Sequence, residues 1–334
     1  MAGKKNEALF YNKTADQEVQ CQLCPHYCKI APSQRGICGV RENKGGTLYS
    51  LNYGEVTSAA MDPIEKKPLY HFYPGSTTLS LGTWGCNLSC SFCQNWRISQ
   101  GKPTTRSYTP EDIVKLAQDK NSTTITFTYS EPVVWSEFIM DVASIAEKEG
   151  LGIILVTNGY ISSKPLKKLL PYLSACNIDL KSVTEKFYKQ HCGGGAPEPV
   201  KNTITSLNKA GVHLEVTNLL IPGENDNREE LEALCDFLQE VDPEIPLHLS
   251  RYFPRHELQN PKTPKNTMTE SFELAQNYLN YVYLGNIDHP QGRKTCCPEC
   301  SAELIDRTYF QLENKLQSGK CPKCGKEIKG RFNN

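Results

Sequence analysis

Short apolar runs alternate with amphipathic stretches between about residues 76 and 290. The apolar runs carry few charges on either face, which is typical of strands in a parallel sheet that is covered on both sides. The stretches between them repeat apolar side chains with the spacing of a helix that buries one face. The pattern predicts strands at 78–82, 124–128, 152–157, 175–180, 214–220, 247–250 and 281–284, and helices that include 110–119, 133–149, 164–170 and 228–240.

This alternation of strand and helix indicates consecutive βαβ units joined by right-handed crossovers. Thr109-Pro110-Glu111-Asp112 has the composition of a helix start, with a capping threonine followed by proline and acids. The pattern by itself leaves open whether the sheet closes into a barrel. We divide the chain into a cysteine-rich metal-binding region with a linker (1–75), a core (76–290) and a zinc-ribbon-like region (291–334).

Cysteine is the residue type that most changes this picture, with 15 in the chain. All but Cys176, Cys192 and Cys235 fall into three short clusters, and those three are typical of free buried thiols. Residues 1–20 contain no apolar core of a secretion signal, and no apolar stretch reaches the roughly 18 residues of a membrane span. We therefore expect a cytoplasmic protein in which clustered thiols ligate metals rather than form disulfides.

Charge excludes some classes of partner. The 37 basic residues equal the 37 acidic residues, and no basic stripe stands out along the chain. This balance argues against nucleic acid or a membrane surface as a partner.

The central cluster, Cys86-x3-Cys90-x2-Cys93, follows the first predicted strand of the core. Three thiolates from one tight loop can bind a cubane [4Fe-4S] cluster and leave its fourth iron without a protein ligand, open to a reacting molecule. A zinc knuckle, or an electron-transfer cluster with a fourth ligand from elsewhere, has the same spacing. The position before a βα series favours the open cluster, because (β/α) enzymes keep their active sites in such loops.

Polar side chains follow the next three predicted strands where each strand ends. Ser130 and Glu131, then Thr157 and Asn158, then Asp179 and Lys181 have this position. Each alone is also typical of a turn or a helix cap. Because the carboxyl ends of parallel strands meet at one mouth of a barrel, we expect these side chains to converge with the cysteines.

Both ends of the chain carry metal-ligand spacings. Two C-x2-C turns at the C-terminal end predict a four-thiolate structural zinc site, with a rubredoxin-like iron site as the alternative. The N-terminal C-x2-C-x3-C-x9-C pattern can hold zinc, which we favour, or an auxiliary [4Fe-4S] cluster, and His26 inside it is a further candidate ligand. The predicted ligands are Cys297, Cys300, Cys321 and Cys324, beside the ambiguous Cys296, and Cys21, Cys24, Cys28 and Cys38. Among the histidines, His213 and His248 are predicted as packed strand residues, and His71 as a substrate contact together with Arg251.

With Phe92 just before its last cysteine, the central motif resembles the signature of the radical S-adenosylmethionine (SAM) superfamily. The following segment, Gln94-Asn95-Trp96, resembles the pyruvate formate-lyase activating enzymes, which have an asparagine at the same offset from the motif. Over nearly its full length, through 21–28, 62–71 and 86–96, the chain resembles the AmmeMemoRadiSam-system radical SAM enzymes. The resemblance implies that Cys86, Cys90 and Cys93 ligate the cluster and that SAM chelates the open iron. One electron then cleaves SAM to methionine and a 5′-deoxyadenosyl radical, which abstracts a hydrogen atom.

The resemblance also implies roles for the polar residues. Ser130 and Glu131 match the Gly-Gly-Glu motif that touches the amino group of SAM, although both glycines are replaced. Thr157 and Asn158 match the ribose and carboxylate region, and Asp179 and Lys181 match the Asp-x-Lys of the activating enzymes. Val156 stands where that subgroup has an acid, so one group that places a cation beside the SAM carboxylate is missing. Phe92 and Gly223, the latter within the adenine region at 221–226, complete the implied SAM contacts.

The fold that we expect is α/β, a partial parallel (β/α)6 TIM-like barrel with cysteine-rich metal-binding N- and C-terminal extensions. The expected function is radical SAM chemistry on an unknown substrate, with activation of a glycyl-radical enzyme as the first specific hypothesis. The expected partners are an electron donor such as flavodoxin or ferredoxin and a protein substrate. A zinc-ribbon adaptor and an electron-transfer iron–sulfur protein without SAM chemistry are the alternatives.

Overall fold

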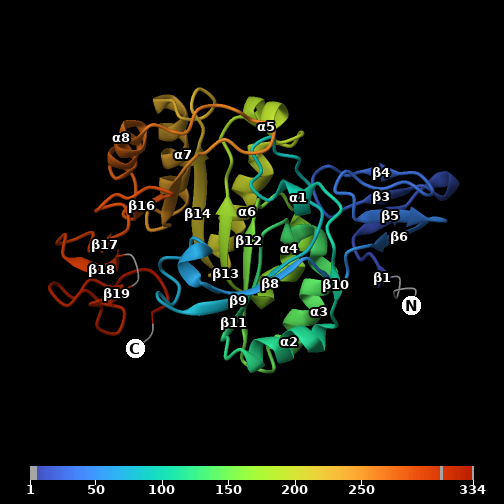
Figure 1. Ribbon diagram of the computed structural model, residues 1–334, viewed down its shortest axis with the longest axis horizontal. Helices are drawn as coiled ribbons and strands as arrows, with labels where there is room; N and C mark the ends of the chain where they lie inside the picture. The colour runs from blue at the N-terminus through green and yellow to red at the C-terminus, as the bar shows by residue number, and fades with distance from the viewer. Residues whose placement is uncertain (1–5, 309–310, 333–334) are drawn as a thin grey trace.

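The computed structural model of the chain, which describes residues 6–308 and 311–332, is built around one eight-stranded sheet (Figure 1). The sheet order is β16-β15-β14-β13-β12-β11-β9-β8, and all neighbours from β9 to β16 are parallel. The parallel strands are β9 (Thr77–Gly82), β11 (Thr124–Phe127), β12 (Gly152–Thr157), β13 (Leu173–Asp179), β14 (His213–Leu220), β15 (Leu247–Arg251) and β16 (Val282–Gly285). Each lies where the apolar pattern predicts a strand, so the predicted α/β fold is confirmed.

One strand of this sheet lies outside the predicted set. Strand β8 (Ser58–Pro63) pairs antiparallel with β9 from within the segment predicted as a linker. Half of its side chains are exposed, so it lacks the continuous apolar run that marks the parallel strands. Strands β8 and β16 form the two edges and do not pair with each other in the described residues, so the barrel is partial.

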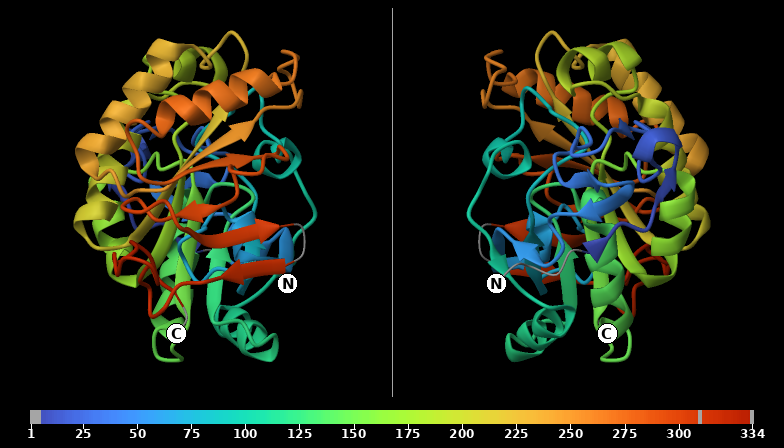
Figure 2. Two further views of the ribbon diagram at one scale, coloured as in Figure 1. Left: turned by 90° about the vertical axis from the view of Figure 1, so that its left-hand side faces the viewer. Right: turned by 90° about the vertical axis from the view of Figure 1, so that its right-hand side faces the viewer.

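The helices follow the strands in βα order and lie along the outer face of the curved sheet (Figures 1 and 2). The predicted start at Thr109 is confirmed, because its Oγ accepts from the Asp112 N–H and the Asp112 carboxylate accepts from the Thr109 N–H. The helix predicted at 133–149 begins as a 3-10 turn, η3 (Pro132–Trp135), before becoming regular. The helices are α1 (Trp96–Ser99), α2 (Pro110–Asp119), α3 (Ser136–Ala146), α4 (Ser163–Leu169), α5 (Glu185–His191), α6 (Pro197–Lys209), α7 (Arg228–Val241) and α8 (Lys265–Ala275), with 3-10 turns η1 (Ala15–Gln17), η2 (Ile64–Lys66) and η4 (Leu170–Tyr172). No helix among the described residues has the length and apolar character of a membrane span.

The two cysteine-rich ends form small antiparallel sheets on opposite sides of the molecule (Figure 1). A buried ion pair, with Arg41 Nη1 and Nη2 at 2.8 and 2.6 Å from the Glu137 carboxylate, joins the N-terminal unit to α3. The Arg307 guanidinium donates to the Tyr70 carbonyl at 2.6 Å and joins the C-terminal unit to the core. The N-terminal strands are β1 (Asn6–Glu7), β2 (Tyr11–Lys13), β3 (Val19–Cys21), β4 (Lys29–Ile30), β5 (Arg41–Lys44) and β6 (Thr47–Ser50); the C-terminal ones are β17 (Thr295–Cys296), β18 (Glu303–Thr308) and β19 (Gln311–Asn314); β7 (Glu55–Val56) pairs with β10 (Arg106–Ser107).

A fully buried carboxylate, Glu215, closes the amino ends of the parallel strands. It accepts from the backbone N–H groups of Tyr70 and His71 at 2.9 and 2.7 Å. It also contacts Nε2 of His213 at 2.9 Å and of His248 at 2.6 Å. Burial alone would raise the pKa of Glu215, but the two histidines hold that pKa well below its ordinary value. His213 and His248 are thus packed strand residues, as expected, and they anchor the segment around His71 under the barrel.

His71 lies at this closed end, so the prediction of a substrate contact is wrong. Its side chain is fully buried and does not line the cavity at the carboxyl ends of the strands. Nδ1 lies 2.7 Å from the Lys329 carbonyl, which can only accept, so this nitrogen carries the proton. Nε2 then accepts from the Tyr283 hydroxyl at 2.5 Å. Accepting at Nε2 needs a neutral ring, and burial lowers the pKa of His71 to about 3.

The buried His71 predicts a loss of stability on mild acidification. An unfolded histidine takes up a proton below pH 6.5, whereas folded His71 stays neutral down to about pH 3, so the unfolded state binds more protons in this window. We expect this group to lower the free energy of unfolding by about 2 kcal/mol between pH 7 and pH 5. Urea denaturation at both pH values, with zinc content monitored, measures it. The non-titrating His71→Gln should show a pH dependence smaller by this amount; equal dependence in both proteins contradicts the prediction.

Candidate active site

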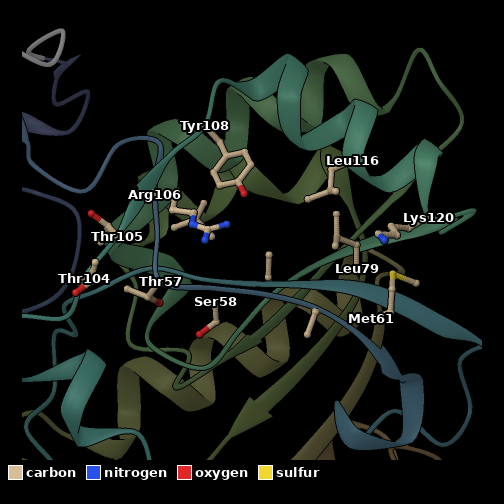
Figure 3. Close-up of a pocket in the computed structure, with 13 residues that line it drawn as sticks. Thr57, Ser58, Met61, Leu79, Thr104, Thr105, Arg106, Tyr108, Leu116 and Lys120 are labelled. Carbon is tan, nitrogen blue, oxygen red and sulfur yellow. The ribbon is translucent and has the colours of Figure 1, made fainter. Parts of the chain in front are cut away.

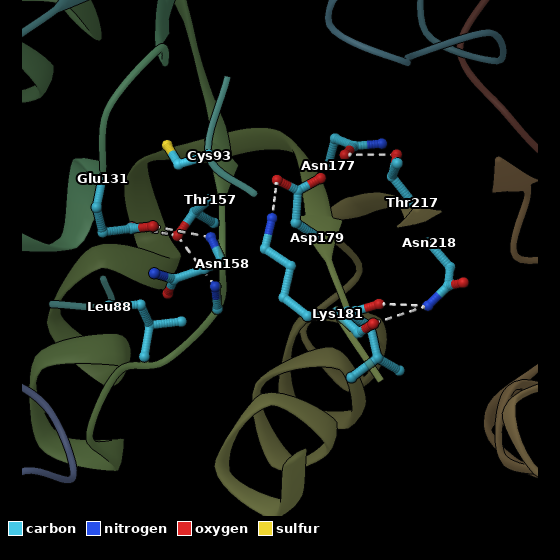
Figure 4. Close-up of polar contacts among 12 residues, drawn as sticks. Leu88, Cys93, Glu131, Thr157, Asn158, Asn177, Asp179, Lys181, Thr217 and Asn218 are labelled. Carbon is cyan, nitrogen blue, oxygen red and sulfur yellow. Dashed lines mark hydrogen bonds and ion pairs between the residues drawn. The ribbon is translucent and has the colours of Figure 1, made fainter. Parts of the chain in front are cut away.

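A cavity of about 350 Å³ opens at the carboxyl ends of the parallel strands, beneath the loop that follows β9. This volume is in the range of small-molecule sites. Figure 4 shows side chains from the ends of β11, β12 and β13 facing the loop. The cavity brings together the predicted residues Cys86, Cys90, Cys93, Phe92, Ser130, Glu131, Thr157, Asn158, Asp179 and Lys181. Gly223 does not line it; it lies in the turn after β14, where its N–H donates to Asp226.

The cysteine loop is held in place by close backbone packing. Gly85 has φ +87°, and a Cβ there would lie 2.5 Å from Val40 Cγ1 and 2.8 Å from the Cys38 carbonyl, so a glycine is required. The N–H groups of Ser89 and Ser91 donate to the carbonyls at the end of α5. Within the loop, the Leu88 N–H donates to Cys86 Sγ at 3.3 Å. Burial raises the pKa of the Cys86 thiol well above its ordinary value, and this contact opposes the shift by stabilising the thiolate, the form that ligates metals.

The Glu131 carboxylate connects the segment after β11 with the end of β12. Its carboxylate accepts from the Val133 N–H at 2.9 Å, from the Asn158 N–H at 2.8 Å and from the Thr157 hydroxyl. Burial raises the pKa of Glu131 to about 7, although these three contacts lower it. A carboxylate with this pKa and a position in the cavity wall responds strongly to a nearby cation.

Tyr129, two residues before Glu131, has a left-handed backbone with φ +68°. This conformation favours glycine, the residue that the Gly-Gly-Glu motif has in this region. Here the strained backbone is held at both ends of the tyrosine. Its carbonyl accepts from Asn95 Nδ2 at 2.8 Å, and its hydroxyl donates to Asp62 at 2.5 Å. The chain therefore takes a backbone conformation that favours glycine here although the residue is a tyrosine.

Asp179 and Lys181 form an ion pair on the facing wall, with 2.8 Å between Oδ2 and Nζ (Figure 4). Burial alone would lower the pKa of Lys181, but Asp179 and the nearby Cys90 raise it above the ordinary value. Lys181 therefore stays positively charged in the cavity, where it can bind a carboxylate.

Asn158 connects the strand ends to the cysteine loop. Its Nδ2 donates to Asn87 Oδ1 at 2.9 Å, and its Oδ1 accepts from the Tyr160 N–H at 2.8 Å. Asn87 in turn donates to the Tyr160 carbonyl at 2.7 Å. Asn87 and Cys192 lie outside the set of site residues predicted from the sequence. The Cys192 thiol beside Cys90 lowers the pKa of Cys90. The one sequence signal that points to Asn87 as a site residue is its position directly after Cys86.

The donor groups of the cavity fit the cofactors implied by the motif. Three cysteines from one loop are the thiolate set for a cluster with an open iron. Ser130 Oγ is buried without a hydrogen-bond partner in the described residues, which leaves an acceptor for an ammonium group such as that of SAM. Lys181 offers the matching cation for a carboxylate. The wall thus presents a hydrogen-bond acceptor for the amino group and a cation for the carboxylate of an amino acid moiety.

A larger cavity of about 700 Å³ lies on the outer side of β8, below α2. Figure 3 shows Arg106 and Lys120 on different sides of it, with Leu79 and Leu116 also lining it. It contains no cysteine, histidine or carboxylate. Its residues therefore provide no thiolate, imidazole or carboxylate ligand for a metal, and the smaller cavity remains the candidate active site.

At the C-terminal end, the sulfurs of Cys297, Cys300, Cys321 and Cys324 all lie within 4.8 Å of one another. Cys296 is outside this group, which resolves the ambiguity between the two adjacent cysteines. Four thiolates at this separation can hold a metal ion.

The chain is similar to several known proteins. Residues 81–238 match the radical SAM superfamily. The chain is 43% identical over 331 residues to the uncharacterized protein MJ0808 of Methanocaldococcus jannaschii, covering 96% of this chain and 98% of that protein. It is 22% identical over 162 residues to the pyruvate formate-lyase-activating enzyme of Clostridium pasteurianum, covering 47% and 67%.

A radical SAM methyltransferase from Sphaerobacter thermophilus has a similar fold, with a TM-score of 0.50, 18% identity and coverage of 64% and 67% of the two chains. The match to the AmmeMemoRadiSam system in particular stays a prediction. The full-length relative and the superfamily match together show that the chain belongs to the family of MJ0808, and that it is an enzyme of the radical SAM superfamily.

Proposed function

We propose that this enzyme binds SAM in the 350 Å³ cavity and cleaves it reductively, to start radical chemistry on a second molecule. The observation that carries the proposal is the convergence, in one cavity, of three cysteines with an unpartnered serine hydroxyl, a buried carboxylate and an ion-paired lysine. A loop that only bound zinc, or that held a cluster only for electron transfer, would need no such polar wall.

The chain's own residues have distinct tasks in this proposal. Cys86, Cys90 and Cys93 would hold a [4Fe-4S] cluster, which supplies the electron that divides SAM into methionine and a 5′-deoxyadenosyl radical. Ser130 Oγ and Glu131 accept from the amino group of SAM. Lys181 binds the SAM carboxylate, and Asp179 keeps the lysine charged and oriented. Thr157, Asn158 and Phe92 complete the wall against which the nucleoside packs, and the turn that contains Gly223 is the proposed adenine contact.

A protein substrate is the more specific proposal. Similarity to a pyruvate formate-lyase-activating enzyme over 162 residues supports hydrogen abstraction from a glycine of a partner protein. The electron would come from a donor such as flavodoxin or ferredoxin, in the cytoplasm. We also propose the division into 1–75, 76–290 and 291–334, in which the core gains β8 from the first segment, and zinc as the metal of the C-terminal cysteines.

The test is anaerobic incubation of the reconstituted, reduced enzyme with SAM, and quantification of 5′-deoxyadenosine and methionine. We expect both products in equal amounts. A colourless zinc protein that does not take up iron and sulfide would favour an adaptor. A brown protein that binds no SAM would favour a pure electron-transfer role. Either result contradicts the proposal.

Glu131→Ala is expected to lower the rate of SAM cleavage by about 100-fold, since a displacement of about 1 Å at a reacting group costs this much. The carboxylate positions the Asn158 and Val133 N–H groups, and its loss frees the end of β12. Steady-state formation of 5′-deoxyadenosine measures the effect, with the exposed Glu111→Ala as the matched control. Equal rates in both variants would show that the carboxylate serves the fold alone.

A further inference from the structure

The four N-terminal cysteines surround one enclosed cavity. Cys21 ends β3, Cys24 and Cys28 lie in the turn before β4, and Cys38 lies before β5. All four line the same cavity, together with the side chains of Ile30 and Arg41 among others. None of the four is exposed beyond an intermediate level. The chain therefore folds these distant thiols around a single space.

The spacing of these sulfurs differs from that of a zinc site. Zn–S bonds of about 2.3 Å in a tetrahedron place sulfurs about 3.8 Å apart. The C-terminal cysteines match, with 3.5 Å between Cys297 and Cys324 and 3.6 Å between Cys300 and Cys321. In the described part of the chain, theirs is the one group of metal-ligating side chains whose ligand atoms all lie within 4.8 Å. The N-terminal sulfurs form no such compact group, and neither do those of the central loop.

Arg41 provides a second, independent observation at this cavity. Its side chain is 1% exposed and lines the cavity. Nη1 and Nη2 are used by Glu137, but Nε is buried without a hydrogen-bond partner in the described residues. An unsatisfied buried N–H next to thiolates indicates a missing acceptor, since such a group costs about 1–3 kcal/mol when unpaired.

We propose that Cys21, Cys24, Cys28 and Cys38 hold a second iron–sulfur cluster, with the Arg41 Nε–H donating to one of its sulfurs. Four irons at separate corners hold thiolates further apart than one zinc ion does. A cluster sulfur also provides the acceptor that Nε lacks. The guanidinium charge offsets the negative charge of four thiolates in a buried place. The sequence pattern by itself favours zinc at these cysteines, because the spacing of their sulfurs cannot be seen in it.

The second cluster would adjoin the active site at Gly85 and Asn87, the residues on either side of Cys86. His26 Nε2 lies 2.7 Å from the Asn87 carbonyl. The Cys38 carbonyl packs against Gly85, where a Cβ would lie 2.8 Å from it. Towards solvent, Tyr27 and Ile37 are exposed beside Cys28 and Cys38. The cluster thus lies between the surface and Cys86, and it can pass one electron from a reduced low-potential iron–sulfur or flavin protein to the central cluster.

Metal analysis of the anaerobically reconstituted full chain tests the proposal without SAM. We expect about eight irons and one zinc per chain, and about four irons in a variant with Cys86, Cys90 and Cys93 all changed to alanine. The variant should keep an iron–sulfur electron paramagnetic resonance signal after reduction. Two zinc ions per chain and an iron-free variant would overturn the proposal. Because SAM is absent, this outcome is distinct from failure of the proposed SAM chemistry.

Arg41→Lys in the same variant background tests the contact with Nε. Hydrogen bonds to cluster sulfurs raise the reduction potential, so its loss should shift the midpoint of the remaining cluster to a lower potential. Lysine keeps the charge beside Glu137. The matched control is Arg35→Lys, because Arg35 is exposed and pairs with Glu42. Equal midpoints in both variants would contradict the assignment of Arg41 as a cluster contact.

Discussion

SAM cleavage is expected to fall to background, by on the order of 10⁴-fold or more, when Cys86, Cys90 and Cys93 are replaced together by alanine. In the proposed function the three thiolates act as one unit that holds the reacting iron, and loss of such a unit removes the chemistry rather than slowing it. The triple variant is more informative than Cys90→Ala, because Cys192 lies beside Cys90 and offers a substitute thiol. Formation of 5′-deoxyadenosine under single-turnover conditions measures the effect.

The matched control is Cys235→Ala, which removes a fully buried thiol of α7 outside the cavity. It should keep both its iron content and its rate of SAM cleavage. Circular dichroism spectra of the triple variant should match those of the wild type, since the loop also packs through Gly85 and Leu88. Cleavage that persists in the triple variant would place the reacting iron elsewhere.

The parallel sheet could be predicted because its strands are buried on both faces. A strand such as β11, buried along its whole length, leaves a continuous apolar run in the sequence. Strand β8 has one neighbour and exposed side chains, so its sequence has no such run. The regular helix predicted at 133–149 begins only at Ser136 in the structure. Before it, the Glu131 side chain accepts from the Val133 N–H and stabilises a 3-10 turn.

The sequence predicts which residues belong to the candidate site, but not the contacts that they make with one another. The rule that strand ends converge placed Glu131, Asn158 and Lys181 in one cavity. The contacts join residues far apart in sequence, such as Asn158 with Asn87, and depend on how the loop docks. The same limit explains the wrong prediction for His71, whose place is set by Glu215 more than one hundred positions away.

Removal of the proposed C-terminal zinc is expected to unfold residues 296–308 and 311–332, while the core keeps its proposed iron–sulfur cluster. Structural zinc sites contribute about 10–16 kcal/mol to the folding of the segment that holds them. The apolar cluster behind the site is small, consisting of Tyr281, Tyr283, Leu304, Ile305 and Ile328 besides the cysteines. A Cys321→Ala/Cys324→Ala variant should therefore lose zinc and become sensitive to trypsin at Lys320 and Lys323.

The effect should spread to one defined part of the core. Arg307 donates to the Tyr70 carbonyl, and the backbone of Arg331 forms an isolated β-bridge with that of Phe72. The segment 69–73 therefore loses these partners when the C-terminal unit unfolds. Hydrogen exchange should accelerate there and not at β11 or β12. The matched control is Cys296→Ala, since Cys296 lies outside the group of four sulfurs. A zinc-free double variant that still resists trypsin would show that the apolar cluster alone holds the unit, and that the metal has a role other than folding.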